Sequence, residues 1–326
     1  MLSRMTLPVL EPVRRRRRRR RRANTLDLAA VGLCLLAAIG AMSWRLLTSG
    51  DVPAQASAPA AAAPLVHETR PLVTGPPLYA GRFDPPLAGA AAILVEASAG
   101  RVVWAQRPHL RLPVASTTKI MTATLVLRHL PLDRIVRIGP TVPRVPLVRE
   151  GLRPGERVPA WKLLYGLLLY SGNDDALALA IATSGSRPAF ISLMNEEARR
   201  LGLRDSHFTS PSGVIDDGNY SSAWDLAALG RYALRDARFR RIVRTRRTEV
   251  SWAAPTYSKV YVNKNRLLKL YPGAIGIKTG WTTLAGPCIV AAATRRGVTL
   301  IAVVLHSAHQ YNDAARLLNF GFASVG

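Results

Sequence analysis

The amino-acid sequence predicts an α+β domain preceded by a membrane-spanning segment. Short apolar runs open the expected domain, helical patterns fill its middle, and β-type runs separated by glycine-containing turns follow near its end. This order is typical of an antiparallel sheet joined to a helical subdomain. The hydrophobic content of 48% and the mean hydropathy of +0.10 fit a globular core combined with one apolar N-terminal segment.

The positive charge of the chain is concentrated at its start. The formal net charge is +25, and residues 1–24 contribute +9, because they hold ten arginines, nine of them consecutive, against Glu11. An arginine run beside an apolar segment is typical of a topology signal or of a contact with anionic lipid, so we expect no nucleic-acid partner. The remaining charge of +16 suits an anionic partner.

Residues 28–44 contain no charged side chain. As a helix they would span roughly 25 Å, the lower limit for crossing a bilayer. Because positive charge keeps the preceding residues inside the cell, we expect a basic cytoplasmic tail over 1–24 and a transmembrane signal-anchor over 25–47, which makes a single-pass protein of the cell membrane. The alternative is a cleaved signal peptide and a secreted protein. The sequence Ala-Gln-Ala at 54–56 has the form of a cleavage site but lies well past the apolar run.

Residues 48–88 are rich in alanine and proline. Such a composition cannot bury enough apolar surface to form a core and tends to stay extended. We therefore expect a spacer over 48–88, in which an ordered contact with the domain begins near Leu78 and Tyr79. One extracytoplasmic domain is expected to follow over 89–326.

Within that domain the sequence predicts strands, then helices, then strands again. Apolar runs at 91–95 and 102–105 flank a turn and predict a β-hairpin. Pro113 suits the entry to a helix that begins at Ser116. Further helices are expected over 161–170, 176–182, 190–201 and 223–233. Strands are then expected over 275–279, 288–294 and 298–305, with a hairpin tip at 295–297 and a closing helix over 313–320.

The histidines and cysteines do not indicate a metal or cofactor site. His306 and His309 lie three residues apart, but no third ligand has a reason to lie near them. Cys34 lies in the apolar N-terminal run and Cys288 far downstream, so we expect no disulfide between them. We therefore expect neither a metal nor a cofactor.

Ser116 and Lys119 form the first motif that carries chemistry. Three residues apart on a predicted helix, they share one face, with β-carbons roughly 5–6 Å apart. A serine is a poor nucleophile until a base accepts its proton. Lysine can be that base only when neutral, a state favoured by burial and by a neighbouring cation such as Lys278. The helix N-terminus also directs backbone N–H groups toward a developing oxyanion, although Ser-x-x-Lys alone is expected by chance about once in a chain of this length.

Ser171, Gly172 and Asn173 form the second motif, at the expected turn between two helices. The Ser171 hydroxyl could pass a proton to a leaving amine, and the Asn173 amide could hold the substrate backbone or Lys119. By itself, this motif favours an ordinary turn with an asparagine cap over a catalytic role.

Lys278, Thr279 and Gly280 form the third motif, in a predicted strand. The lysine and the threonine hydroxyl can bind a terminal carboxylate, and the glycine leaves room for a substrate to lie along the strand edge. The backbone N–H of Trp281 would then be placed for the oxyanion. All three motifs in this order are far less probable by chance than any one of them.

The three motifs resemble the Ser-x-x-Lys, Ser-Asp-Asn and Lys-Thr-Gly set of penicillin-binding proteins and class A β-lactamases, with Ser-Gly-Asn in the second place. Over about 87–322 the chain resembles the D-alanyl-D-alanine carboxypeptidase family, the low-molecular-mass penicillin-binding proteins. The segments that carry this resemblance are 113–123, 194–213, 263–268, 276–282 and 285–297. The resemblance implies a penicillin-binding-protein/β-lactamase-like fold.

The resemblance also implies a serine peptidase. It implies an acyl-enzyme on Ser116 with Lys119 as the general base, assisted by Ser171 and Asn173, and a substrate bound by Lys278. The implied reaction removes the terminal D-alanine from peptidoglycan stem peptides, and β-lactams would acylate the same serine.

Three other functions stay open on the same fold. A β-lactamase needs an acid that activates water, in a segment of the type Glu-x-x-x-Asn, and no such segment occurs between Asn173 and Lys278. A D,D-endopeptidase would use the same chemistry on a crosslink, and a non-catalytic wall-binding protein would share only the fold. Many family members carry histidine where this chain has Asn219.

Overall fold

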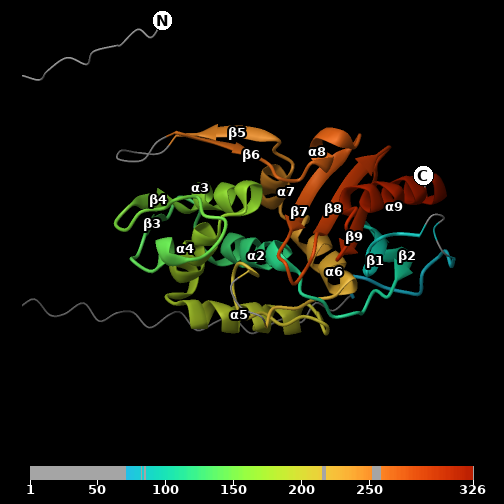
Figure 1. Ribbon diagram of the computed structural model, residues 1–326, viewed down its shortest axis with the longest axis horizontal. Helices are drawn as coiled ribbons and strands as arrows, with labels where there is room; N and C mark the ends of the chain where they lie inside the picture. Colours follow the sequence, from blue (N-terminus) through green and yellow to red (C-terminus); the bar gives the residue numbers. More distant parts are fainter. Residues whose placement is uncertain (1–70, 82, 84–85, 215–217, 252–257, 326) are drawn as a thin grey trace, which may run out of the picture. The chain divides into compact units, whose positions relative to one another are not determined.

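A computed structural model of the protein describes residues 71–81, 83, 86–214, 218–251 and 258–325 (Figure 1). The expected cytoplasmic tail, the expected signal-anchor and Cys34 lie outside these residues. Within the described ranges, none of the helices is by itself both long and apolar enough to cross a membrane.

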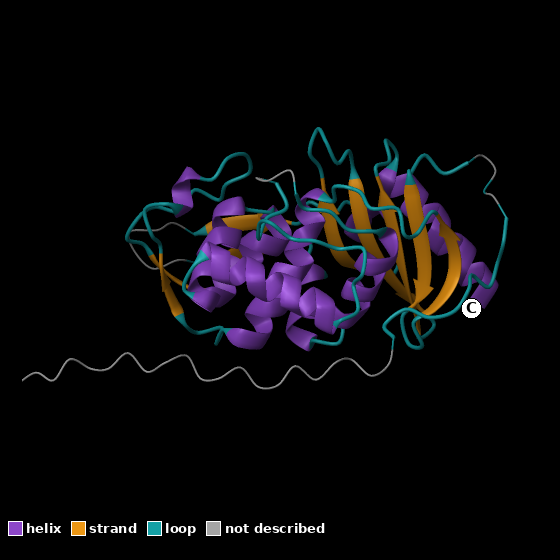
Figure 2. Ribbon diagram, turned by 90° about the horizontal axis from the view of Figure 1, so that it is seen from below, coloured by secondary structure: helices purple, strands orange, loops and turns teal. Residues whose placement is uncertain are grey.

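The centre of the domain is a five-stranded antiparallel sheet (Figure 2). Its strands are β1 (Ala91–Glu96), β2 (Arg101–Gln106), β7 (Ala274–Gly280), β8 (Cys288–Arg295) and β9 (Val298–Leu305). Their order is β2-β1-β9-β8-β7, and the pairing of β1 with β9 aligns Ala91 with Leu305. The β8–β9 turn contains Arg296 and Gly297, both at positive φ, as tight hairpins require.

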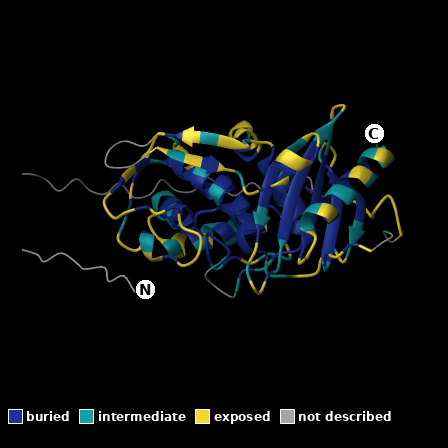
Figure 3. Cartoon of the chain, turned by 45° about the horizontal axis from the view of Figure 1, so that its top comes forward, coloured by how far each residue is buried: buried dark blue, intermediate teal, exposed yellow. Residues whose placement is uncertain are grey.

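Helices cover both faces of this sheet. Helix α9 (Gln310–Val325) lies on one face, and α2 (Lys119–His129) and α6 (Ala223–Ala233) lie on the other. Because alternate residues of a strand point to opposite faces, Leu94 packs in the cluster that contains α9, whereas the adjacent Ile93 packs in the cluster that contains α2. The strands are therefore buried on both sides, as Figure 3 shows.

The helical subdomain lies beside the sheet and is built around α2 (Figure 1). Its other helical elements are α3 (Ala160–Tyr165), a π-helical segment (Gly166–Tyr170), α4 (Asn173–Ser184), α5 (Arg187–Arg200) and α7 (Ala237–Val243). The first nine residues of α2 are all buried. This helix therefore supplies a fixed support for the residues at its N-terminal end.

The hairpin, the helices and the meander predicted from the sequence are present, so the α+β class with an antiparallel sheet is confirmed. Several short elements were not predicted, because three or four residues are too few to show a period. These are β3 (Ile135–Arg137), η2 (Val142–Arg144), β4 (Arg157–Pro159), β5 (Arg247–Val250), β6 (Lys259–Val262) and α8 (Leu267–Leu270). The helix predicted to begin at Ser116 starts instead with the 3₁₀ turn η1 (Ala115–Thr118), and α2 follows from Lys119.

The described part of the expected spacer packs against the domain. Leu72 and Val73 are buried in the core, and Thr74 forms a parallel bridge with Arg101 at the start of β2. The ordered contact therefore begins earlier in the chain than Leu78, where the sequence placed it. Two apolar side chains inside the alanine- and proline-rich stretch account for this difference.

Candidate active site

Ser116 lies in the 3₁₀ turn η1, which leads directly into α2. Strand β7 passes so close to this turn that a β-carbon added at Gly280 would lie 2.9 Å from the carbonyl oxygen of Val114 and 3.0 Å from the backbone nitrogen of Ser116. Such distances are not accommodated without a shift of the backbone. Gly280 is therefore required for the packing of β7 against the turn, which adds to the substrate role expected from the sequence.

Lys119 lies at the centre of the site and is fully buried. Its Nζ lies 2.8 Å from Ser116 Oγ, and it donates to Asn173 Oδ1 at 2.8 Å and to the carbonyl oxygen of Ser212 at 3.2 Å. Two of these partners can only accept, whereas the serine hydroxyl can also donate. A neutral amine thus satisfies both carbonyl oxygens with its two N–H groups and keeps its lone pair for the proton of Ser116.

The surroundings of Lys119 favour this neutral form. Burial lowers the pKa of Lys119 well below its usual range, and the charge of Lys278 lowers it further, whereas Asp175 opposes the change. A lysine with a lowered pKa is a competent base near neutral pH.

Ser171 and Asn173 are positioned by a sharp change of helix direction. The π-helical segment ends at Ser171, whose φ of 73° lies in the left-handed region. A non-glycine residue there costs of order 1 kcal/mol or more, and such strain is found mainly at functional sites. At Gly172 a β-carbon would overlap the carboxyl group of Asp175. The turn places Asn173 at the first position of α4, where its Nδ2 donates to the carbonyl oxygen of Pro146 at 3.0 Å.

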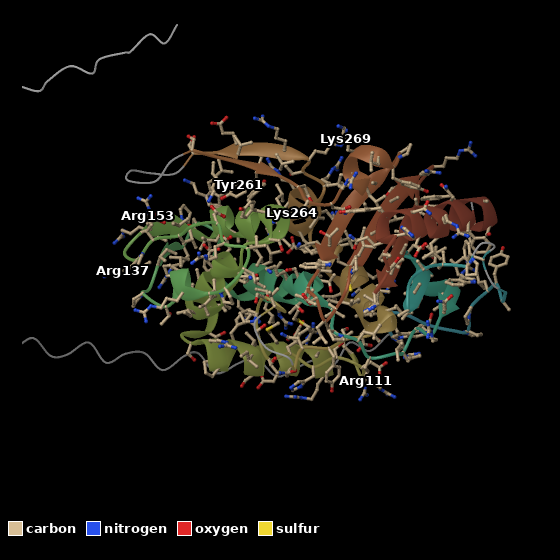
Figure 4. The ribbon with its side chains drawn as sticks, viewed as in Figure 1. Arg111, Arg137, Arg153, Tyr261, Lys264 and Lys269 are labelled. Carbon is tan, nitrogen blue, oxygen red and sulfur yellow. The ribbon has the colours of Figure 1, made fainter. Side chains whose placement is uncertain are left out.

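Lys278 is a second buried amine, on β7. Its Nζ donates to the carbonyl oxygen of Thr279 at 2.9 Å. Burial and the charge of Lys264 lower the pKa of Lys278 to about 7. Lys264 comes shortly after β6 in the sequence and is labelled in Figure 4. Its ammonium lies 4.4 Å from the ring centre of Tyr170. A carboxylate bound beside Lys278 would restore its charge, because an opposite charge favours the protonated amine.

A cavity of about 300 Å³ opens in front of Ser116. Asn173 and Asn219 lie in its wall, and Leu147 and Trp281 lie at its mouth with exposed fractions of 65% and 66%. No charged side chain is among its described lining residues. We call this space the catalytic cavity.

Asn219 organises the loop that supplies the third partner of Lys119. Its Oδ1 accepts from the backbone N–H of Thr209 at 2.9 Å, and its Nδ2 donates to Ser210 Oγ at 2.8 Å. The same hydroxyl oxygen accepts from the backbone N–H of Gly213 at 3.0 Å, which fixes the carbonyl group of Ser212. The asparagine therefore has a defined structural role here. The Ser212 carbonyl was missed from the sequence, because any residue type can supply a backbone acceptor.

Three carboxyl groups lie behind the site and were also missed. Asp174 accepts from the backbone N–H groups of residues 150–152 at 2.8–3.1 Å. Glu150 accepts from the hydroxyl of Tyr261, which Figure 4 shows on β6. Burial, followed by the charge of Glu150, raises the pKa of Asp175 well above its usual range, and burial also raises the pKa of Glu150. The only signal in the sequence was the acidic start of a predicted helix.

No group of three or more potential metal ligands occurs among the residues that the structure describes. Cys288 is buried with a free thiol, and burial raises its pKa to about 11. A thiol that stays protonated and covered is chemically inert.

Comparison with known proteins connects this geometry to a family. Residues 82–309 match the sequence model of the peptidase S11 family, described as D-alanyl-D-alanine carboxypeptidase. The chain is 36% identical over 262 residues to the D-alanyl-D-alanine carboxypeptidase of Streptomyces sp. strain K15, covering 73% of this chain and 89% of the relative. It is 33% identical over 242 residues to the D-alanyl-D-alanine carboxypeptidase DacF of Bacillus subtilis, covering 71% of this chain but only 61% of that protein.

Solved structures agree with the sequence comparison. The Streptomyces K15 DD-transpeptidase has a TM-score of 0.71 at 34% identity, and the match covers 75% of this chain and all of that one. A penicillin-binding protein homolog from Mycobacterium tuberculosis has a TM-score of 0.69 at 30% identity, covering 75% of this chain and 95% of that one. The fold, the paired serine and lysine, and these matches lead to one conclusion: the chain belongs to the peptidase S11 family of D-alanyl-D-alanine carboxypeptidases.

Proposed function

We propose that this protein is a serine-type D-alanyl-D-alanine carboxypeptidase that removes the terminal D-alanine from peptidoglycan stem peptides. The observation that carries the proposal is the position of the buried Lys119 Nζ, 2.8 Å from Ser116 Oγ at the catalytic cavity. The similarity to the D-alanyl-D-alanine carboxypeptidases of Streptomyces and Bacillus supports the same assignment.

In the first half of the proposed reaction, Ser116 Oγ attacks the carbonyl carbon between the two D-alanines and Lys119 Nζ takes its proton. Backbone N–H groups at Ser116 and Trp281 stabilise the negative charge on the carbonyl oxygen. The C–N bond then breaks, and the leaving D-alanine receives a proton through the Ser171 hydroxyl. The product is an ester between Ser116 and the shortened peptide.

In the second half, water attacks the ester. Lys119 accepts a proton from the water and the Ser116 oxygen receives one as the C–O bond breaks, which releases the peptide and restores the enzyme. Lys278 and Thr279 bind the terminal carboxylate of the substrate, which lies along the outer edge of β7. Charge on Lys278 is needed for this contact.

Two related activities differ only in the groups that enter or leave. The chain is 30% identical over 240 residues to an Escherichia coli D-alanyl-D-alanine endopeptidase, so cleavage of a D,D-crosslink is the second candidate. β-Lactams would acylate the same serine, and rapid hydrolysis of that adduct would instead indicate a β-lactamase. A domain that binds wall peptides but resists acylation would be a non-catalytic protein.

The proposed location is the outer face of the cell membrane, with residues 25–47 as the anchor. The uncharged run at 28–44 and the arginines before it support this topology. Protease added to intact spheroplasts should then digest the domain, and the mass of the mature chain should include the N-terminal segment. A protected domain or a shortened secreted chain would contradict the anchored form.

The central experiment combines activity with detection of the ester. Purified protein should release one D-alanine from a pentapeptide that ends in D-Ala-D-Ala, and mass spectrometry after benzylpenicillin treatment should find one adduct on Ser116. Ser116→Ala should lose both while keeping its circular dichroism spectrum, whereas the control Ser324→Ala on α9 should keep both. Release of D-alanine by folded Ser116→Ala would refute the proposed nucleophile.

A further inference from the structure

A second cavity continues the catalytic cavity on the far side of Asn173. It has a volume of about 510 Å³ and includes Arg144, Leu177, Ile181 and Arg187 in its lining. We call it the arginine cavity. Asn173 lines both spaces, so the two cavities meet at a residue whose side chain also contacts Lys119.

The two cavities also share their walls. One wall is the segment 144–148, whose first residues line the arginine cavity and whose last residues line the catalytic cavity. The other wall is the segment 211–214, of which residues 211 and 212 line the arginine cavity and residues 213 and 214 line the catalytic cavity. The bond from Asn173 Nδ2 to the carbonyl oxygen of Pro146 joins the first wall to the floor. The two cavities therefore adjoin at Asn173, and we call the adjoining spaces the groove.

The chemistry of this groove changes along its length. The part nearest Ser116 is uncharged among its described residues, whereas the far part has apolar side chains below two guanidinium groups. Arg144 is exposed and has no ion-pair partner among the described residues. Arg187 donates to the carbonyl oxygen of Thr209 at 3.4 Å. No acidic side chain lines either cavity within the described part of the chain, so the far end favours an anion.

The direction of the substrate follows from the proposed function, on which this inference rests. Lys278 and Thr279 hold the carboxylate of the residue that leaves. The acyl part stays on Ser116 and has to extend away from that contact, and the groove past Asn173 offers such a path. The residues of the peptide upstream of the cleaved bond therefore lie in the groove.

We propose that this groove is the acyl-donor subsite and that Arg144 recognises a carboxylate carried by the peptide upstream of its D-alanines. A guanidinium binds a carboxylate with directed, charge-assisted hydrogen bonds. The apolar floor formed by Leu177 and Ile181 suits the methylene groups between that carboxylate and the residue attached to Ser116. An amidated peptide would fill the same groove but lose the ion pair.

The test uses three peptides that end in D-Ala-D-Ala. The first carries a γ-linked D-glutamate two residues upstream of the D-alanine that becomes attached to Ser116, and the α-carboxylate of this glutamate is free. The second has that carboxylate converted to the amide, and the third is diacetyl-L-lysyl-D-Ala-D-Ala, which lacks the group altogether. For the wild-type protein, kcat/KM should be about fivefold higher for the first peptide than for the second, as expected for a partly exposed ion pair.

Arg144→Gln should remove this preference and lower kcat/KM for the third peptide much less than for the first. The matched control is Arg137→Gln, an exposed arginine on β3 that lines neither cavity and that Figure 4 shows away from β7. The Arg137→Gln variant should keep the preference for the first peptide. In the wild type, 0.5 M salt should weaken this preference, because salt screens an exposed ion pair. Equal kcat/KM for the first two peptides, or an unchanged preference in Arg144→Gln, would overturn the inference. Failure of the wild type to release D-alanine from any of the three would instead refute the proposed function and this subsite with it.

Discussion

Replacing Lys278 with methionine should make the protein more stable while it removes the proposed carboxylate contact. The side chain is 2% exposed, and its pKa is about 7 in the folded protein against 10.5 for an ordinary lysine. The unfolded chain therefore binds more protons than the folded chain between these two values. In this window the stability of the wild type rises with pH. The stabilisation from Lys278→Met should be largest below pH 7, where the folded protein holds a buried charge.

The size of the effect follows from the same values. Each pKa unit corresponds to about 1.4 kcal/mol. The burial of Lys278 thus lowers the free energy of unfolding by about 5 kcal/mol at pH 6, where the folded protein holds the charge, and by about 1 kcal/mol at pH 9.5, where folding removes the proton. Methionine is close to lysine in volume and removes this cost, so it should stabilise the protein by up to these amounts.

Urea unfolding of both proteins at pH 6 and pH 9.5 measures this difference. Lys269→Met serves as the control, because Lys269 is exposed on α8 and should show no comparable pH dependence. Release of D-alanine should fall in the Lys278→Met variant, because methionine cannot bind the carboxylate of the substrate. The variant would thus be more stable but less active, as is common where a buried charge serves function. A stability gain that is the same at both pH values, or no gain at pH 6, would show that Lys278 is not a desolvated cation.

Two further substitutions test the packing behind the nucleophile and the carboxyl pair. Gly280→Ala should slow acylation of Ser116 by benzylpenicillin by about 100-fold, because the new methyl group would displace the turn at Val114; stopped-flow rates close to those of the wild type would contradict this. Asp175→Asn should remove a loss of stability that begins as the pH rises above the usual aspartate range, since a carboxyl group with a raised pKa favours the fold only while it is protonated; urea midpoints of wild type and variant that run parallel from pH 4 to pH 9.5 would contradict the raised pKa of Asp175.

The residues of the three motifs could be found from the sequence because each motif is local. Ser116 lies in the 3₁₀ turn that leads directly into α2, where Lys119 is the first residue, so their distance is set by local helical geometry. The contact between Lys119 and Asn173 was one of two alternatives for this amide, since no spacing rule brings α2 and α4 together. The larger strands and helices were predicted for the same local reason, through apolar runs long enough to show a period.

The rest of the site depends on the tertiary arrangement. The contact of Lys119 with the Ser212 carbonyl and the contacts of Asn219 with its loop use backbone groups. Because nearly every residue type has these groups, the sequence does not indicate such contacts. Glu150 and Asp175 lie on different segments of the chain, and the raised pKa of each depends on burial, which sequence patterns do not reveal. In the sequence, nothing distinguishes Arg144 from other surface arginines. Its place at the arginine cavity follows only from the fold.

The two borders of the main sheet are treated differently. At β2 the segment 74–79 covers the border, with the N–H groups of Leu78 and Tyr79 donating to the carbonyl oxygens of Val102 and Val103 at 3.1 Å. At β7, no further strand pairs with the sheet among the residues that the structure describes. Exposed borders invite pairing with other chains and are usually protected. The edge strand β2 is thus covered by the protein's own chain, whereas the edge strand β7, beside Ser116, is not paired with another strand. Selection against self-association should therefore act mainly on β7.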